Sequence, residues 1–330
     1  MNNDAIRQLV GRRSLKATEF APWVLLIAAF LLLPDYLLLG RQIIIMTIFA
    51  ISLDIILGYA GIITLGHAAF YGVGAYTAGL LAVHGWHEPI SGLLISGGVS
   101  ALAALIFGLA IFKTSEVATV MLTMVIALLG LELANRFQGI TGGFDGLEGI
   151  TIAPLFGTFD FDFFGKTAFL YCLGVLFLVW VVARFLVNAP FGRSLVGIQE
   201  NPTRMEALGV SVYKRRVVAF AISGAVAGLA GALTTQTNQF VSLDVFSFAL
   251  SGTVLVMLVF GGVGRLYGAF IGVPIYVIAQ NIFATIDPVY WLFWMGILLV
   301  IVVLFFPRGI IGISDRLRSR LGKSRAGRTE

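Results

Sequence analysis

The fold of this chain is decided by the stretch Gly58-Tyr-Ala-Gly-Ile-Ile-Thr-Leu-Gly-His-Ala-Ala-Phe-Tyr-Gly-Val-Gly-Ala-Tyr76. It places five glycines within residues 58–74, in a region that carries no charged residue between Asp54 and Glu88. Each glycine inside a helix costs about 1 kcal/mol relative to alanine, so one continuous helix over this stretch is not expected. An interrupted helix in an apolar environment must bury its free backbone groups in protein or against a water-filled cavity. The stretch therefore predicts a broken or re-entrant element inside a helical membrane protein.

The composition of the whole chain supports a membrane environment. Of its 330 residues, 58% are hydrophobic and only 12% are charged, and the mean hydropathy is +0.96. Charged residues make up about a quarter of a typical soluble domain. A soluble fold of this size could not cover its surface with so few polar side chains, which excludes soluble, disordered, collagen-like and nucleic-acid-binding classes. We therefore expect residues 1–330 to form a single domain, an all-α, polytopic membrane helix bundle.

Apolar runs long enough to cross a bilayer indicate about ten transmembrane helices. A hydrocarbon core of about 30 Å needs roughly 20 apolar residues per helix. The predicted spans cover residues 20–40, 42–57, 64–83, 90–112, 117–134, 167–187, 217–240, 248–264, 266–286 and 291–306.

Charge placement predicts the orientation of these spans. An alternating topology with the N-terminus in the cytoplasm puts 19 of the 22 basic residues on the cytoplasmic side, as the positive-inside rule requires. The net charge of +5 is therefore mainly a topology signal. The N-terminal segment 1–19, the loop 188–216 and the basic tail 307–330 are then cytoplasmic, and the tail lies against anionic membrane lipids. The basic residues left on the outer side are Arg41, Arg136 and Lys166.

Small residues recur at four-residue spacing in two predicted spans. Such residues let helix backbones approach closely in lipid, so we expect these stripes to be buried packing faces. The stripes are Gly92, Ser96, Ser100, Ala104 and Gly108 in one span, and Ala219, Ser223, Ala227 and Gly231 in the other.

The cytoplasmic loop 188–216 contains one short predicted helix. Asn201 is a suitable N-cap, Pro202 suits the first helical position, and Gly209 stops the helix. The helix carries Met205 and Leu208 beside charged residues, a pattern suited to docking into a groove on another protein. A solvated connector explains the same pattern, and the spacing alone does not separate these interpretations.

Polar residues within the predicted spans are the candidates for a transport pathway. An intramembrane carboxylate costs about 2.5–3.5 kcal/mol on insertion scales, so its presence calls for a reason. Asp54 and Glu132 are the candidate carboxylates inside the spans. Thr64, His67 and Gln236 complete the candidate set. A hydrogen bond between helices is the competing interpretation for these residues.

Neither a metal site nor a catalytic site is predicted. Residues 84–88 hold two histidines and a glutamate, which we interpret as a solvated outer loop rather than as metal ligands. The sequence contains no Gly-x-x-x-x-Gly-Lys-Ser/Thr phosphate loop and neither a His-Glu-x-x-His nor a Gly-x-Ser-x-Gly motif. We therefore expect no enzyme activity, no ATPase site and no bound cofactor on this chain.

Six motifs occur in order along nearly the whole chain, and together they identify a family resemblance. They are Gly58-Tyr-Ala-Gly61, Leu65-Gly-His-Ala-Ala-Phe-Tyr-Gly-Val-Gly-Ala-Tyr-Thr77, Thr141-Gly-Gly-Phe-Asp-Gly-Leu147, Glu200-Asn-Pro-Thr-Arg-Met-Glu-Ala-Leu-Gly209, Gly261-Gly-Val-Gly264 and Phe306-Pro-Arg-Gly309. With this set the chain resembles the LivM-type permease of branched-chain amino acid ABC importers. One departure is that the proline ending the coupling signature of other importers is absent after Gly209.

The resemblance implies a set of partners and a role for the short helix. The partners are a LivH-type sister permease, two cytoplasmic ATPase subunits that hold ATP and Mg²⁺, and a periplasmic solute-binding protein. The location is the bacterial plasma (inner) membrane, with both termini cytoplasmic. The short helix becomes the coupling helix that contacts an ATPase, and its residues are Asn201, Pro202, Arg204, Glu206, Ala207 and Gly209.

Two alternatives to a branched-chain amino acid importer stay open at this point. An ion-coupled secondary transporter would also have ten spans and broken helices, although only Asp54 is available as a mid-membrane coupling carboxylate. A permease of the same family for urea or short amides differs only in substrate, which the separate binding protein largely selects.

Overall fold

The computed structural model describes residues 21–160 and 165–305, and the regular elements of these residues are helices. The segment 1–19, the tail 307–330 and the motif at 306–309 lie outside the described residues. The helices are α2 (Ala21–Leu32), η2 (Pro34–Tyr36), α3 (Leu37–Asp54), η3 (Ile55–Tyr59), α4 (Ala68–Val83), α5 (Pro89–Ile111), α6 (Glu116–Arg136), α7 (Gln138–Thr141), η4 (Gly143–Asp145), α8 (Lys166–Asn188), α9 (Pro190–Glu200), α10 (Pro202–Ala207), α11 (Val212–Asn238), η5 (Leu243–Phe246), α12 (Phe248–Gly261), α13 (Leu266–Ile286) and α14 (Trp291–Phe305).

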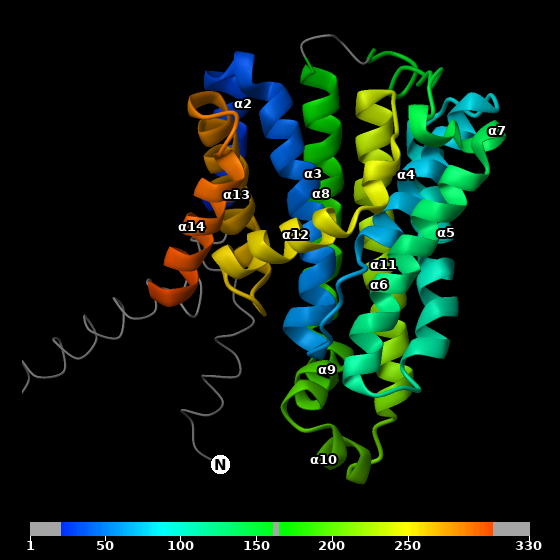
Figure 1. Ribbon diagram of the computed structural model, residues 1–330, viewed down its shortest axis with the longest axis vertical. Coiled ribbons are helices and arrows are strands. Elements are labelled where there is room, and N and C mark those ends of the chain that lie inside the picture. The colour runs from blue at the N-terminus through cyan, green and yellow to red at the C-terminus, as the bar shows by residue number, and fades with distance from the viewer. Residues whose placement is uncertain (1–20, 161–164, 306–330) are drawn as a thin grey trace, which may run out of the picture.

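The long helices form a bundle whose axis sets the long dimension of the molecule. α3, α5, α6, α8 and α11 run along this axis, whereas α12 lies across it (Figure 1). α9 and α10 lie at one end of the bundle, which we call the α10 end (Figure 1). α2, α13 and α14 gather on one side of the bundle (Figure 1).

The polytopic membrane bundle expected from the sequence is confirmed. Within residues 21–160 and 165–305, six helical stretches are long and apolar enough to cross a bilayer, judged by length and composition. The apolar helices α2, α4, α12 and α14 are shorter. With its 14 residues, α12 extends over only about 21 Å, less than a hydrocarbon core of about 30 Å. An apolar helix therefore stands at each of the ten predicted spans, but ten complete crossings stay a prediction.

The boundary between the first two predicted spans is wrong. The sequence placed a break at Gly40 and Arg41, whereas the chain breaks at Pro34–Tyr36 and α3 runs through both residues. Proline disfavours the helical conformation of the residue before it, which explains the end of α2. Gly40 lies in close contact with α8, because a Cβ atom there would come 2.7 Å from the Phe169 ring.

Both stripes of small residues are buried, as predicted. α11 packs against α4 and α5 through its glycines. A Cβ atom at Gly228 would collide with Ser100, and one at Gly224 would collide with Ala104. In lipid the hydrophobic effect does not drive helices together. The van der Waals contacts of such closely packed backbones stabilise the helix pair instead.

The predicted broken element is confirmed in the glycine-rich stretch. α3 ends in one π-helical turn, η3, and residues 61–67 then continue without helical structure until α4 begins at Ala68. Gly61 starts this segment with φ +68°, a left-handed conformation that favours glycine. We call residues 61–67 the broken segment.

Candidate functional site

The two glycine clusters that stood out in the sequence meet in space. A Cβ atom at Gly58 would lie 2.7 Å from the Cα of Gly264, so the two backbones touch. Gly264 N–H donates to Oδ1 of Asp54 across 2.7 Å. Gly264 has φ +76° and belongs to the turn between α12 and α13. The end of α3 therefore holds this turn in place through one carboxylate and two glycines.

Asp54 is fully buried, and only one of its oxygens is paired. Its Oδ2 atom has no hydrogen-bond partner among the described residues. The hydrogen bond to Gly264 matches the interpretation of Asp54 as a link between helices. A direct role of Asp54 in the pathway stays a prediction.

His67 ends the broken segment inside a buried polar cluster. Its Nε2 atom lies 2.8 Å from Ser52 Oγ and 3.4 Å from Ser223 Oγ. Both serine hydroxyls donate to backbone carbonyls, Ser52 to Phe49 and Ser223 to Ser52. Since those protons are used, Nε2 must be the donor toward the serines, which leaves Nδ1 as an acceptor. That Nδ1 atom is buried and has no partner among the described residues.

Backbone N–H groups in the broken segment and at the start of α4 are paired with helices from elsewhere in the chain. Ala68 N–H donates to Ser251 Oγ of α12 across 2.9 Å. Leu65 N–H donates to Thr123 Oγ1 of α6 across 3.4 Å. Thr64, which is buried, accepts from the N–H of Gly66 at 3.4 Å. Sequence reasoning missed Thr123 and Ser251, although a hydroxyl in an apolar span is a signal for such a partner.

The remaining two pathway candidates lie apart from this cluster. Gln236 is buried near the end of α11, where its Nε2 donates to the Pro89 carbonyl at 2.8 Å. Tyr171 of α8 donates to Gln236 Oε1 at 3.0 Å, so the glutamine joins α5, α8 and α11. Glu132 is exposed on α6. The structure thus brings Asp54, Thr64 and His67 to one region around the α3–α4 break, and their part in a pathway stays a prediction.

The short helix predicted in the loop 188–216 is confirmed as α10. Asn201 Oδ1 accepts from Arg204 N–H at 2.9 Å, and Pro202 is the first helical residue. Gly209 ends the helix with φ +84° and donates to the Glu206 carbonyl at 2.9 Å. Arg204, Glu206, Ala207 and Leu208 are exposed, and Leu208 has 69% of its surface accessible. An exposed leucine on a capped helix is suited to docking.

A second helix in this loop, α9, was not predicted. Met205 points away from the exposed face of α10 onto α9, where a Cβ atom at Gly197 would come 2.7 Å from its sulfur. α9 in turn touches the broken segment, because a Cβ atom at Gly61 would come 2.8 Å from Gln199 Cγ. The sequence expectation that Met205 shares the docking face with Leu208 is therefore wrong. α10, α9 and the broken segment form a continuous series of contacts.

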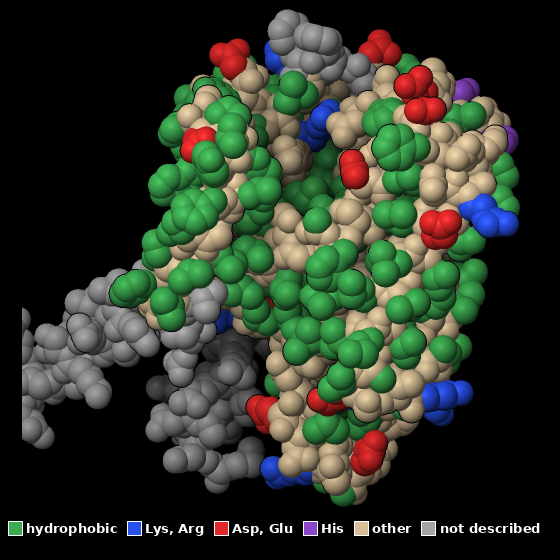
Figure 2. Space-filling view, viewed as in Figure 1, with side chains coloured by type: hydrophobic (Ala, Val, Ile, Leu, Met, Phe, Trp, Pro, Cys, Tyr) green, Lys and Arg blue, Asp and Glu red, His purple; other side chains and the backbone are tan. Residues whose placement is uncertain are grey.

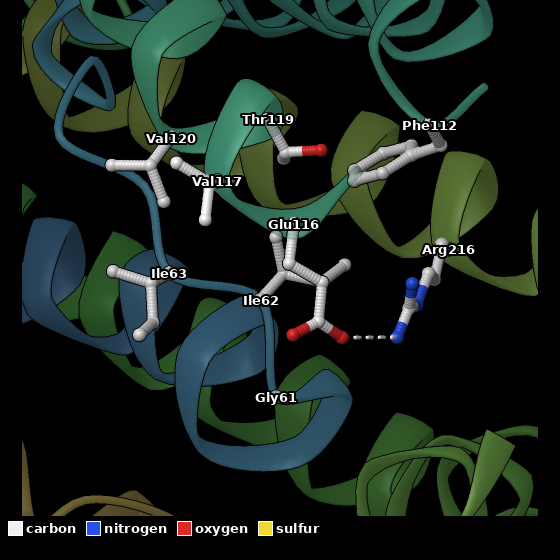
Figure 3. Close-up of a pocket in the computed structure, with 9 residues that line it drawn as sticks. All are labelled: Gly61, Ile62, Ile63, Phe112, Glu116, Val117, Thr119, Val120 and Arg216. Carbon is white, nitrogen blue, oxygen red and sulfur yellow. Dashed lines mark ion pairs between the residues drawn. The ribbon is translucent and has the colours of Figure 1, made fainter. Parts of the chain in front are cut away.

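An open pocket of about 220 Å³ lies beside this series of contacts (Figure 3). Glu116 and Arg216 point toward each other at its edge, with 3.8 Å between Oε1 and Nη2 (Figure 3). The Glu116 side chain is 87% exposed, so this ion pair adds little stability. The broken segment therefore borders open space on this side. The pocket is lined by Gly61, Ile62, Ile63, Phe112, Glu116, Val117, Thr119, Val120 and Arg216.

Comparison with known proteins gives a consistent set of relatives. The model of the family described as branched-chain amino acid transport system / permease component matches residues 36–303. The high-affinity branched-chain amino acid transport system permease protein LivM of Salmonella typhimurium is 28% identical over 303 residues, covering 84% of this chain and 70% of that protein. LivM of Escherichia coli K12 is 28% identical over 288 residues, covering 80% and 67%. The ribose import permease protein RbsC of Haemophilus influenzae is 25% identical over 312 residues, covering 87% and 91%. No solved structure matches the chain.

Proposed function

The chain belongs to the family of branched-chain amino acid transport permease components, and from this premise we propose that it imports branched-chain amino acids together with a LivH-type sister permease. As a member of this family it is a multi-pass transport subunit of a binding-protein-dependent ABC importer, and it lacks an ATPase domain. Membership of this family replaces the alternative interpretation of the chain as an ion-coupled secondary transporter. The LivM relatives support leucine, isoleucine and valine as substrates. Because the relatives also include a ribose permease, the family alone does not define the substrate.

The partners follow from the architecture of such importers. Two ATPase subunits bind ATP and Mg²⁺ in this proposal, and a solute-binding protein delivers the substrate on the opposite side. No cofactor is assigned to this chain. We place the α10 end in the cytoplasm of a bacterial plasma membrane, with both termini on that side, because the basic residues of the sequence concentrate there.

In the proposed mechanism, α10 transmits the movement of an ATPase subunit to the membrane helices. The main support for this mechanism is the series of contacts from α10 through α9 to the broken segment. The exposed face of α10 presents Arg204, Glu206 and Leu208 to an ATPase. A movement of α10 acts on α9 through Met205 and Gly197, and α9 acts on the broken segment through Gln199 and Gly61. Packed elements of this kind shift as units rather than deform continuously. The broken segment is hydrogen-bonded to α6, and Ala68, directly after it, is hydrogen-bonded to α12, so both helices move with it.

The test is transport by the complete importer reconstituted in proteoliposomes with its partner subunits and binding protein. Labelled leucine, isoleucine and valine are offered in parallel with urea, a short amide and ribose. Uptake of the three amino acids that depends on ATP supports the proposal. Uptake of urea, the amide or ribose instead of the amino acids would refute the substrate.

The coupling role of α10 is tested with Glu206→Ala. We expect this variant to lower uptake and binding-protein-stimulated ATPase activity at least about tenfold while the permease still inserts in the membrane, because a desolvated interface charge contributes about 2–5 kcal/mol. Glu148→Ala is the matched control, because Glu148 is exposed in the segment between α6 and α8, away from the α10 end. Normal uptake by the Glu206→Ala variant would refute the coupling role of α10.

A further inference from the structure

Arg41 is the charged residue that the proposed mechanism leaves unexplained. It lies in the second turn of α3, away from the α10 end, and was one of the few basic residues predicted on the outer side. Its Nη1 donates to the Thr237 carbonyl at 2.9 Å, and its Nη2 donates to Asn238 Oδ1 at 2.7 Å. These bonds fix the guanidinium at the C-terminal end of α11. Within residues 21–160 and 165–305, no carboxylate forms an ion pair with it.

A cavity of about 410 Å³ opens beside the guanidinium. Its size falls within the range of about 300–1,000 Å³ that is typical of small-molecule sites. Figure 2 shows that this face of the molecule is hollowed near the end opposite α10, with Lys or Arg atoms inside the hollow. Four apolar side chains of α3 form one part of the wall, and polar side chains form the rest. The lining residues are Leu38, Leu39, Arg41, Gln42, Ile45, Met46, Thr234 and Asn238.

The chemistry of this lining fits a small amphipathic anion. A guanidinium has five N–H donors in a planar fork that matches a carboxylate, and only two of its N–H groups are used by α11. A cation in a partly apolar cavity is costly without an anion, so a bound carboxylate recovers part of that cost. The α11 carbonyls and Asn238 compensate the charge only in part, because they are dipoles. Ile45 and Met46 line the apolar part of the cavity, where they would contact the hydrocarbon part of the bound anion.

We propose that this cavity is a substrate site in which Arg41 binds the carboxylate of an aliphatic amino acid while Leu39, Ile45 and Met46 contact its side chain. This inference rests on the proposed function for the identity of the substrate. In the proposed orientation the site faces the side on which a binding protein releases its cargo. Arg41 is therefore the first residue of the chain to recognise the substrate, and Asn238 positions the guanidinium for it.

The experiment measures binding of L-leucine to the assembled, nucleotide-free importer in lipid nanodiscs by saturation-transfer NMR. L-Leucinamide is the comparison probe, because it keeps the side chain and the amino group but has no carboxylate. We expect the wild-type importer to bind leucine and to discriminate against leucinamide. Arg41→Met should raise the Kd for leucine about tenfold or more and abolish the discrimination, since a hydrogen bond to a charged group contributes at least that factor.

Two further variants keep the test decisive. Arg136→Met is the matched control, since Arg136 is exposed at the end of α6 and does not line the cavity, and its leucine binding should equal that of the wild type. Met46→Trp fills the cavity without changing its charge, so it should also lose leucine binding. It keeps the test valid where Arg41→Met fails to assemble. Wild-type leucine binding in both cavity variants, or no leucine signal in the wild type, would overturn the inference. Absent uptake of branched-chain amino acids would instead refute the proposed function, whatever the NMR result.

Discussion

At the residue scale, the polar side chains buried in the membrane region act first as connectors. Asp54 holds the turn before α13, His67 joins two serines of α3 and α11, and Gln236 joins three helices. Each of these bonds replaces a hydrogen bond that water would supply to a soluble protein. On Asp54 and His67, one buried atom each, Oδ2 and Nδ1, has no hydrogen-bond partner among the described residues. Both atoms are acceptors near the broken segment whose hydrogen-bonding capacity is unused among the described residues.

The role of Asp54 as a hydrogen-bond acceptor can be tested by two substitutions. Asp54→Ala leaves the Gly264 N–H buried without a partner, so the permease should lose about 1–3 kcal/mol of stability. Asp54→Asn keeps an acceptor oxygen and should lose much less. The measurement is the thermal unfolding of the purified importer in detergent. Equal losses in both variants would show that the charge, and not the hydrogen bond, is required.

At the element scale, the break between α3 and α4 organises its neighbours. The broken segment touches α6 through Thr123 and α9 through Gln199, and Ala68 at the start of α4 touches α12 through Ser251. The sequence predicted that the helix would break, because glycine weakens helices regardless of context. It did not predict these partners, because they are 58, 183 and 138 residues away from Leu65, Ala68 and Gly61. α10 was predicted because N-cap and stop residues act locally, within one helix.

The connection between α10 and α9 leads to a prediction about coupling efficiency. Met205→Ala removes the side chain that joins α10 to Gly197 of α9. We expect the ATPase activity to persist while the amount of leucine imported per ATP falls several-fold, because the motion no longer reaches the broken segment. Both quantities are measured in the same proteoliposomes.

Thr203→Ala supplies the control for this measurement, since Thr203 is exposed on the same short helix. Its ratio of leucine to ATP should equal that of the wild type. An unchanged ratio in the Met205 variant would show that α10 acts on the membrane helices by another route.

At the scale of the whole molecule, the α10 end and the opposite end present different surfaces. Loop 188–216, with five basic residues and α10, lies at one end, and residues 137–160 lie at the other (Figure 1). Phe144 is 85% exposed in that second segment. The only native thiol, Cys172, is buried and is therefore a poor target for labelling.

The orientation can be tested with one new cysteine at each end. In a Cys172→Ala background, Phe144→Cys should react with a membrane-impermeant maleimide added to intact spheroplasts. Leu208→Cys, in a permease expressed without its ATPase subunits so that α10 is uncovered, should react only after the membrane is permeabilised, because α10 is placed in the cytoplasm. The reverse pattern would invert the topology.

The sequence by itself determined that this is a helical membrane protein, where its apolar helices lie and which residues cap α10. These properties follow from composition and from interactions within a few residues, which are present in the linear order. Only the tertiary structure decided that the two glycine clusters touch, that α9 joins α10 to the broken segment, and that Arg41 stands beside a cavity rather than in a loop. The break assigned to Arg41 was wrong because a charge in an apolar run resembles a span boundary. Arg41 lies within α3 because two acceptors at the end of α11, nearly 200 residues further along the chain, pair with its guanidinium.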